Sequence, residues 1–175
     1  MKILVVRHGE TDWNNNNLVL GRNDVPLNEA GIGQAQQLRD NFPSEIDRVF
    51  ASPLKRAAKT ASIACEGENL DIHYDNRLME MDFGTFEGID RGDQTYNTKK
   101  KEYFIKYPEG ESYLMVAQRV YNFLDEVIKQ YPNENIMLVT HNGICRLINT
   151  YFNGMTNEEF SKYGVNNCEV TEYTI

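Results

Sequence analysis

Four side chains in this 175-residue chain have the types that transfer of a phosphoryl group requires. A neutral imidazole is a good nitrogen nucleophile near pH 7, because its reference pKa is about 6.5. A guanidinium group is always charged, and its donors match phosphate oxygens in pairs. One histidine can therefore attack phosphorus while a second histidine and two arginines hold the phosphoryl oxygens. The candidates are Arg7, His8, Arg56 and His141.

Short hydrophobic segments rich in β-branched residues precede these candidates and are typical of buried strands. We predict strands at residues 3–6, 49–51 and 136–139, with shorter or more exposed strands at 72–74 and 168–175. Apolar residues at helical spacing predict helices at residues 28–38, 54–65, 116–128 and 144–152. Asn28 is the expected N-cap of the first helix, whose apolar side chains would be Ile32, Ala35 and Leu38.

The alternation of strands and helices predicts βαβ units, and hence a mostly parallel sheet covered by helices on both faces. The fold class is therefore α/β, with one three-layer α/β/α domain at residues 1–175. Residues 81–110 show little periodicity, and we expect a small cap there with a short helix near 99–107. Ligands of parallel sheets bind at the carboxyl ends of the strands, so the candidates should meet at one edge.

A departing alkoxide needs a proton, and Glu80 is the candidate acid. Its apolar neighbours would remove water from the carboxyl and favour its protonated form. Spacing alone does not distinguish Glu80 from Asp82 or Glu87. A metal site made from His8, Glu10 and His141 is conceivable, but no histidine pair with helical spacing supports it.

Composition and charge exclude several classes of protein. The net charge of −8 argues against nucleic acid as the main partner, because phosphate backbones need a broad basic face. The longest apolar segment is far shorter than a membrane span, which takes roughly 20 residues. Three cysteines without close spacing suggest neither a disulfide framework nor a zinc cluster, so we expect a reducing cytoplasm.

Six ordered segments of the chain resemble the motifs of the histidine phosphatase superfamily, in its phosphoglycerate-mutase-like branch. They are residues 4–14 (LVVRHGETDWN), 24–31 (DVPLNEAG), 52–61 (SPLKRAAKTA), 80–88 (EMDFGTFEG), 108–112 (PEGES) and 139–146 (VTHNGICR). The resemblance extends along the whole chain. The compact length is similar to that of small bacterial phosphatases, including α-ribazole phosphatases.

This resemblance implies that His8 becomes phosphohistidine, while Arg7, Arg56 and His141 hold the phosphoryl oxygens. Glu80 would protonate the leaving oxygen and then deprotonate water. It also implies phosphate contacts from Asn14 and the Gly21 backbone. Arg22, directly after Gly21, and Asn142 are two further candidates for contact with the substrate. The resemblance implies no metal and no cofactor. The substrate would be a small phosphorylated metabolite, whose identity the sequence leaves open, as it does the oligomeric state.

Four further features lie outside the catalytic set. Leu20 and Phe86 replace the glutamine and tryptophan that many relatives carry, which would remove one polar substrate contact and alter packing. The run 99–101 of three lysines could recognise a second anionic group, or could simply face solvent. His73 matches no motif and is expected to be an ordinary strand residue.

The same catalytic set serves hydrolysis and phosphoryl transfer between metabolites. Residues 81–110, which separate Glu80 from Glu111, allow only a modest cap, which favours water as the acceptor. A metal-independent phosphatase is therefore the first interpretation, and a phosphoglycerate mutase is the alternative. A binding protein without catalysis is the third, but all five catalytic side chains are present.

Overall fold

Four parallel strands and one antiparallel strand form the central sheet of the computed structural model, which describes residues 1–175. In chain order the strands are β1 (Lys2–Arg7), β2 (Arg48–Ala51), β3 (Ile72–Tyr74), β4 (Ile136–Thr140) and β5 (Val170–Thr174). Their spatial order is β3-β2-β4-β1-β5. Only β5, at one edge, runs antiparallel to its neighbour β1. The predicted mostly parallel sheet is confirmed.

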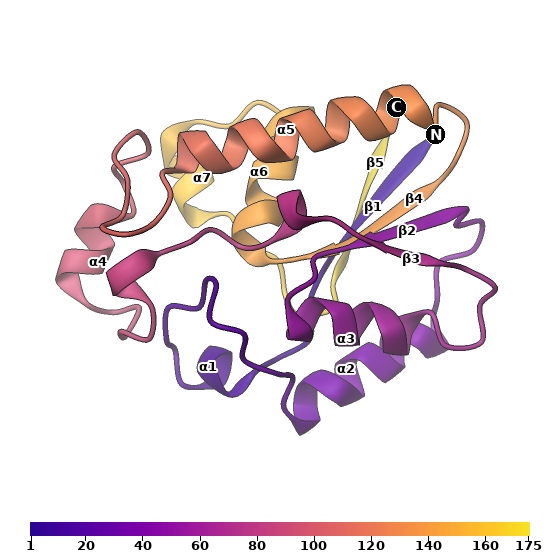
Figure 1. The fold of residues 1–175 in the computed structure, drawn as a ribbon, viewed down its shortest axis with the longest axis horizontal. Coiled ribbons are helices and arrows are strands. Elements are labelled where there is room, and N and C mark those ends of the chain that lie inside the picture. Colours follow the sequence, from indigo (N-terminus) through magenta and orange to yellow (C-terminus); the bar gives the residue numbers. More distant parts are fainter.

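Helices cover both faces of this sheet. They are α1 (Asp12–Asn15), α2 (Glu29–Asp40), α3 (Lys55–Ala64), α4 (Gln94–Lys99), α5 (Tyr113–Gln130), α6 (Asn142–Phe152) and α7 (Asn157–Lys162), with 3₁₀ turns η1 (Asn76–Leu78) and η2 (Gly84–Phe86). Helices α2 and α3 lie on one face, and α5 and α6 lie on the other (Figure 1). The predicted α/β/α fold class is therefore confirmed. None of the helices combines the length and hydropathy that a membrane-spanning segment requires.

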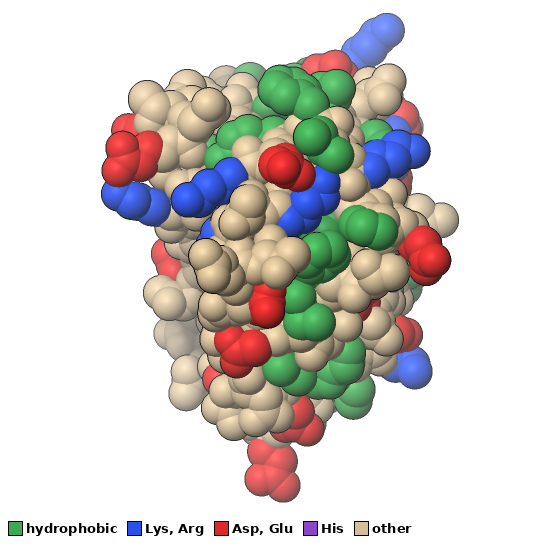
Figure 2. Space-filling view, turned by 90° about the vertical axis from the view of Figure 1, so that its left-hand side faces the viewer, with side chains coloured by type: hydrophobic (Ala, Val, Ile, Leu, Met, Phe, Trp, Pro, Cys, Tyr) green, Lys and Arg blue, Asp and Glu red, His purple; other side chains and the backbone are tan.

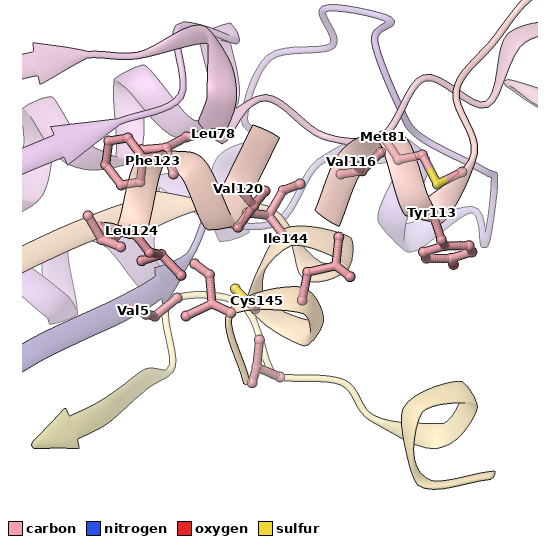
Figure 3. Close-up of a cluster of buried hydrophobic side chains, with 14 of the residues drawn as sticks. Val5, Leu78, Met81, Tyr113, Val116, Val120, Phe123, Leu124, Ile144 and Cys145 are labelled. Atoms are coloured by element: carbon pink, nitrogen blue, oxygen red, sulfur yellow. The ribbon is translucent and has the colours of Figure 1, made fainter. Parts of the chain in front are cut away.

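Alternating side chains of the central strands fill two separate hydrophobic cores. Ile3 and Val5 of β1 point to the core beneath α5 and α6, whereas Leu4 and Val6 pack against α2 and α3. This is the two-sided burial that continuous apolar strands predict. Figure 3 shows part of the larger core, where Phe123 of α5 lies next to Leu78 and Leu124 lies near Val5. Burial on both faces fixes the strands whose ends carry the candidate residues.

Capping side chains set where the two longest helices begin. The Asn28 carboxamide oxygen accepts from the Gly31 N–H at 2.8 Å and starts α2, as predicted. Ser112 starts α5 in the same way, with its hydroxyl accepting from the Met115 N–H. The prediction for Ile32 was wrong, because this side chain is 36% exposed and Gly31 takes its place on the buried face of α2.

The 81–110 segment contains a short helix, but the predicted position at 99–107 was wrong. Helix α4 spans Gln94–Lys99, because the Asp93 carboxylate accepts from the Tyr96 N–H at 3.0 Å and caps the helix there. Residues 100–105 form turns instead. In Figure 1, α4 lies beyond the end of the sheet where the parallel strands finish, and therefore on the side of the candidate residues.

Candidate active site

The carboxyl ends of β1, β2 and β4 deliver His8, Ser52 and His141 to one edge of the sheet. Strand pairing continues just beyond the strands, because the His8 N–H donates to the Thr140 carbonyl at 2.9 Å. The Ser52 N–H likewise donates to the Val139 carbonyl at 3.0 Å. The two imidazole centroids lie 5.1 Å apart. The three segments that follow these strands therefore meet at one edge of the sheet, as the sequence predicted.

A single hydrogen bond fixes the tautomer of His8. Its Nδ1 lies 2.6 Å from the Gly9 carbonyl oxygen, which can only accept, so Nδ1 carries the proton. In the neutral ring, Nε2 then keeps its lone pair and makes no hydrogen bond. Burial, together with Arg56 and Arg7, lowers the pKa of His8 well below 6.5. His8 is therefore an uncharged imidazole at neutral pH, with Nε2 available as a nucleophile.

Gly9 is required by the close approach of α2. A Cβ atom at this position would lie 2.5 Å from the Gly31 carbonyl oxygen, which is closer than side chains come. The Gly9 N–H donates to the Thr60 hydroxyl of α3 at 3.0 Å. The loop after β1 is thus held between α2 and α3, and this contact fixes the backbone that orients the His8 ring.

His141 is held by the hydroxyl of Ser52. The His141 Nε2 lies 2.7 Å from the Ser52 oxygen, which also accepts from the Leu54 N–H at 3.3 Å. Ser52 is fully buried, and His141 Nε2 is the one acceptor to which its hydroxyl can donate. The proton of a neutral His141 is therefore on Nδ1, which is buried without a partner. Burial, then Arg56 and His8, lowers the pKa of His141 well below 6.5.

Two arginines without a carboxylate partner flank the histidines. Arg56, in the first turn of α3, is fully buried and donates to the carbonyls of Gly21 at 2.7 Å and Asn23 at 2.9 Å. Arg7 ends β1 and donates to the Val165 carbonyl at 2.7 Å. Burial lowers the pKa of Arg56 to about 10, so it stays charged at neutral pH.

Three of the five buried side-chain polar atoms without partners belong to the candidate residues. They are Nε of Arg7, Nε of Arg56 and Nδ1 of His141, whereas the other two belong to Arg22 and Tyr107. Leaving a buried donor unpaired costs about 1–3 kcal/mol, and a charged donor costs more. The unpartnered donors of these residues therefore match a group with several acceptor oxygens, such as a phosphoryl group.

Of the three candidate acids, Glu80 alone lines a cavity that Asn142 and Gly143, the two residues after His141, also line. Its carboxylate accepts from the Met81 N–H at 2.9 Å and from the Gly143 N–H at 3.0 Å, and it is 6% exposed. Glu87 instead accepts from the backbone N–H groups of Arg22 and Asn23. Asp82 accepts from the Gly84 N–H within its own turn.

The side chains of the other predicted contact residues serve the local structure. The Asn14 oxygen accepts from the Thr11 N–H and caps α1, and the Asn142 oxygen accepts from the Val165 N–H. Arg22 faces Glu111, at 3.3 Å, and the sulfur of Met79. Of these side chains, Asn142 lines the cavity and the other two do not.

The backbone of Gly21, the fourth predicted contact, must be glycine because of what surrounds it. A Cβ atom there would lie 2.5 Å from both the Met81 carbonyl and the Glu87 carboxylate. The Gly21 carbonyl is also one of the two acceptors that hold Arg56. This glycine therefore joins the loop after α1 to the arginine of α3.

The cavity next to Glu80 has a volume of about 200 Å³, and several of its lining residues were not among the predicted site residues. Arg91, Tyr96 and Arg146 line it, together with Lys100 from the lysine run. Lys99 pairs with Glu102 at 2.8 Å, and Lys101 is exposed. Arg146 was visible as the last residue of the VTHNGICR motif, whereas no sequence signal pointed to Arg91.

The carboxylates, cysteines and histidines are spread too widely for a metal site. No three of these side chains lie close enough together to hold an ion. Glu10, which a site with both histidines would need, accepts from the Asn28 carboxamide at 2.9 Å.

A profile of the histidine phosphatase superfamily (branch 1) matches residues 3–175. Phosphoserine phosphatase 1 of Hydrogenobacter thermophilus is 30% identical over 100% of this chain and 85% of its own length. A probable phosphoglycerate mutase of Proteus mirabilis is 31% identical over 81% of this chain and 69% of its own. A putative α-ribazole-5′-P phosphatase from Escherichia coli superposes with a TM-score of 0.86 and 28% identity, covering 98% of this chain and 89% of that one. The profile spans nearly the whole chain, and the chain belongs to the histidine phosphatase superfamily.

Proposed function

We propose that this protein is a phosphatase that hydrolyses a small phosphomonoester through a phosphohistidine at His8. The observation that carries the proposal is the state of His8: a neutral ring with Nδ1 bound to the Gly9 carbonyl and Nε2 free, beside three unpartnered donors. Membership of the superfamily supports phosphatase or mutase activity. The five residues act as follows.

In the first step, His8 Nε2 attacks phosphorus and the bond from phosphorus to the leaving oxygen breaks. Arg7 and Arg56 neutralise the charge on the phosphoryl oxygens, and His141 donates its Nδ1–H to one of them. Glu80, in its protonated form, gives a proton to the leaving oxygen as that bond breaks. The alcohol departs and a phosphoryl group remains on His8.

In the second step, water attacks the phosphoryl group and Glu80 takes one of its protons. The bond between phosphorus and Nε2 breaks, and inorganic phosphate and the free enzyme are released. Glu80 is suited to both steps because two backbone N–H groups hold its carboxylate at the edge of the cavity. Asn14, Arg22, Asn142 and the backbone N–H of Gly21 are proposed as additional contacts, with no metal and no cofactor required.

The mutase alternative differs only in the second acceptor, a hydroxyl of another phosphorylated molecule in place of water. We propose that residues 81–110 form a cap over the site, because Tyr96 and Lys100 from this segment line the cavity. A cap of this length gives water access to phosphohistidine, which favours hydrolysis. A binding protein without catalysis would not require His8 to be held in a single tautomer.

The test is release of phosphate from a phosphomonoester panel in EDTA, by the unchanged protein and by His8→Ala. The panel contains p-nitrophenyl phosphate, 3-phosphoglycerate, sugar phosphates, nucleotides and α-ribazole phosphate. We expect turnover that EDTA does not reduce and that falls by at least ~10⁴-fold in His8→Ala, because the nucleophile is lost. Turnover by His8→Ala above about one per cent would reject His8 as the nucleophile. Exchange between 2- and 3-phosphoglycerate without net hydrolysis would favour the mutase.

A further inference from the structure

The loop that carries Glu80 forms neither helix nor strand. It connects η1, which ends at Leu78, to η2, which begins at Gly84. Glu80 is nevertheless 6% exposed, and His8 and His141 are buried too. Figure 2 shows the face on the side of α4, on which no histidine is visible. The position of the carboxyl group is therefore set inside the molecule, by contacts of its loop with neighbouring elements.

An ion pair between Arg119 and Glu111 holds this loop. Arg119, in α5, donates from Nε to one carboxylate oxygen of Glu111 at 3.0 Å and from a terminal nitrogen to the other at 3.1 Å. The same guanidinium donates to the main-chain carbonyls of Arg77 at 2.6 Å and Glu80 at 3.2 Å. The Glu111 carboxylate also accepts from the Asp82 N–H at 2.9 Å. The pair therefore holds the main chain before, at and after Glu80.

Two main-chain groups of the loop depend on this pair for their hydrogen bonds. The Glu80 carbonyl bonds to Arg119 and the Asp82 N–H bonds to Glu111, and neither has a main-chain partner. In a helix or strand, such groups would be paired within the element itself. Without the ion pair, the loop would have to shift until these groups met other partners or water, and the carboxyl group of Glu80 would shift with it.

The pair of Arg119 and Glu111 is also more enclosed than the other ion pairs of the molecule. Its side chains are 17% and 16% exposed. In every other ion pair, at least one side chain is 29% exposed or more. Burial by itself would raise the pKa of Glu111, but the hydrogen bond and the charge of Arg119 outweigh it and lower that pKa. Glu111 therefore stays an acceptor for both the arginine and the loop.

Glu111 connects the loop of Glu80 with the loop that holds Arg56. Its carboxylate lies 3.3 Å from a terminal nitrogen of Arg22. The carbonyl of Gly21, the preceding residue, accepts from Arg56 at 2.7 Å. The ion pair thus links the proposed proton donor to an arginine of the proposed phosphoryl site.

We propose that Arg119 and Glu111 are positioning residues for Glu80, which hold its loop so that the carboxyl group reaches the leaving oxygen. This inference rests on the proposed function, in which Glu80 transfers the proton. Neither side chain lines the cavity, so both act through the main chain of the loop. Placement matters because a shift of about 1 Å at a reacting group can lower a rate by ~10²-fold. A planar guanidinium suits this role, because its fork can hold a carboxylate and two carbonyls at once.

Arg119→Gln tests the inference through its dependence on the leaving group. The departing oxygen of an alkyl phosphate needs a proton, whereas that of p-nitrophenyl phosphate does not. The parameter to compare is kcat/KM, which reports the step that forms phosphohistidine. We expect it to fall by ~10- to 100-fold on the alkyl phosphate of the panel that is hydrolysed fastest, and by no more than ~3-fold on p-nitrophenyl phosphate. A general loosening of the fold would lower both values equally.

Three further variants separate positioning from charge and from stability. Arg119→Lys keeps the charge without the fork, and should show the same selective loss, of at least ~5-fold, if Arg119→Gln does not fold. In Glu80→Gln, the addition of Arg119→Gln should cost less than ~3-fold more, because no proton donor is left to position. Arg77→Gln is the matched control. Its guanidinium pairs with Asp75 and Glu126 just before the loop, and its loss should affect both substrates equally.

Amide hydrogen exchange reports the position of the carboxyl group without turnover. The Gly143 N–H donates to the Glu80 carboxylate at 3.0 Å and lies in the first turn of α6, where the helix supplies no acceptor. Exchange at Gly143 should therefore become at least ~10-fold faster in Arg119→Gln and in Arg119→Lys. It should stay unchanged in Arg77→Gln.

Equal losses on the two substrates, or a full additional loss from Arg119→Gln in Glu80→Gln, would overturn the inference. Turnover by the unchanged protein, together with unchanged exchange at Gly143 in both Arg119 variants, would reject only the positioning role and leave the phosphatase standing. Faster exchange at Gly143 without turnover of any phosphomonoester would reject only the phosphatase, because Arg119 would still be shown to hold Glu80.

Discussion

Ser52 determines which nitrogen of His141 carries a proton, although it is too far along the chain to be recognised as a partner. Its buried O–H needs an acceptor, and of its two hydrogen-bond partners only His141 Nε2 can accept, because the Leu54 N–H is a donor. A neutral His141 can then donate its Nδ1–H to a phosphoryl oxygen. The role of His141 as a donor therefore does not require the ring to be charged in the free protein, where burial and Arg56 lower its pKa.

Removing the Ser52 hydroxyl should allow the proton of neutral His141 to move between Nδ1 and Nε2. In Ser52→Ala we expect kcat to fall by ~10- to 100-fold, while the KM of the substrate changes less, because the donor matters most in the transition state. Nitrogen NMR shifts of His141 would check the cause. They should report a proton on Nδ1 in the unchanged protein and a mixture, or Nε2–H, in the variant. Nδ1–H in both proteins would contradict this account.

Glu80 should matter in proportion to how poor the leaving group is. Glu80→Gln keeps the hydrogen-bond acceptor but cannot transfer a proton, so alkyl phosphates should lose ~10²- to 10⁴-fold in kcat. Aryl phosphates such as p-nitrophenyl phosphate should lose much less, because an aryl oxide leaves without protonation. Steady-state rates on both substrates measure the difference.

Glu87→Gln is the control for Glu80, since Glu87 holds the backbone of Arg22 and Asn23 and does not line the cavity. Its effect on the two substrates should be equal. Equal losses on both substrates in Glu80→Gln would assign Glu80 to positioning instead of proton transfer.

At the scale of elements, the first turn of α6 approaches Glu80 closely. A Cβ atom on Gly143 would lie 2.4 Å from a Glu80 carboxylate oxygen. Gly143→Ala should therefore displace the carboxylate and lengthen its bond to the Gly143 N–H. We expect a loss of at least ~10²-fold in kcat on alkyl phosphates, the size of a general-acid effect.

The cost of Gly143→Ala to the fold should be small, because the added methyl meets the end of a side chain. Thermal unfolding would check this against Gly33→Ala, where no atom lies within 4 Å of the added Cβ. Gly33→Ala should stabilise α2 by up to about 1 kcal/mol, because alanine favours the helix. An active Gly143→Ala would show that Glu80 tolerates a shifted position.

The sequence predicted best those elements whose burial is continuous along the chain. Strands β1 and β4 are apolar at nearly every position, and their predicted bounds were close to the observed ones. Helix α7 was missed because it has six residues, and its Phe160 is held by Tyr103 and Tyr113 from other segments. The short helix of the 81–110 segment was predicted too late in the chain, because the carboxylate of Asp93 caps α4 and sets its start at Gln94.

For the candidate site, the sequence could predict the residues that follow strands but not those that only tertiary structure brings near. His8 and His141 were placed by the rule of strand ends. The choice of Glu80 over Asp82 and Glu87 needed the family resemblance or the structure, because all three belong to one loop. Arg91 lacked any signal, because it lines the cavity together with residues of α6 that lie some fifty positions further along the chain.

For the whole molecule, the two buried histidines make stability depend on pH. The pKa values of His8 and His141 are lowered well below 6.5 by burial and then by Arg56, whereas an unfolded chain binds protons near pH 6.5. Below that pH the unfolded state holds more protons than the folded state, so the free energy of unfolding falls as pH falls. The slope should approach about 1.4 kcal/mol per pH unit for each histidine.

Urea unfolding between pH 7.5 and 5 would measure this dependence. The pKa values of the carboxylates Glu111 and Asp75 are also lowered in the folded protein, so their protonation at low pH would reduce the free energy of unfolding too. This loss begins near pH 4.5, below the chosen interval. His8→Asn should halve the slope, because one buried histidine remains. His73→Gln is the control and should leave it unchanged, since His73 is exposed on β3, as expected for an ordinary strand residue. A flat profile in the unchanged protein would contradict the neutral state of both rings.

Arg7 and Arg56, which lack carboxylate partners, would also bind the product of a catalytic cycle. Arg7 lies close enough to Arg56 to contribute to its lowered pKa, after the larger effect of burial, so the two charges repel each other. Inorganic phosphate bound between the two guanidinium groups would relieve that repulsion, and we expect it to bind the folded state alone. Phosphate should therefore both protect the fold against heat and compete with substrate, in line with RT ln(1 + [L]/Kd). For the proposed phosphatase, the same pair of arginines that would bind the substrate would therefore also make inorganic phosphate an inhibitor of its own release.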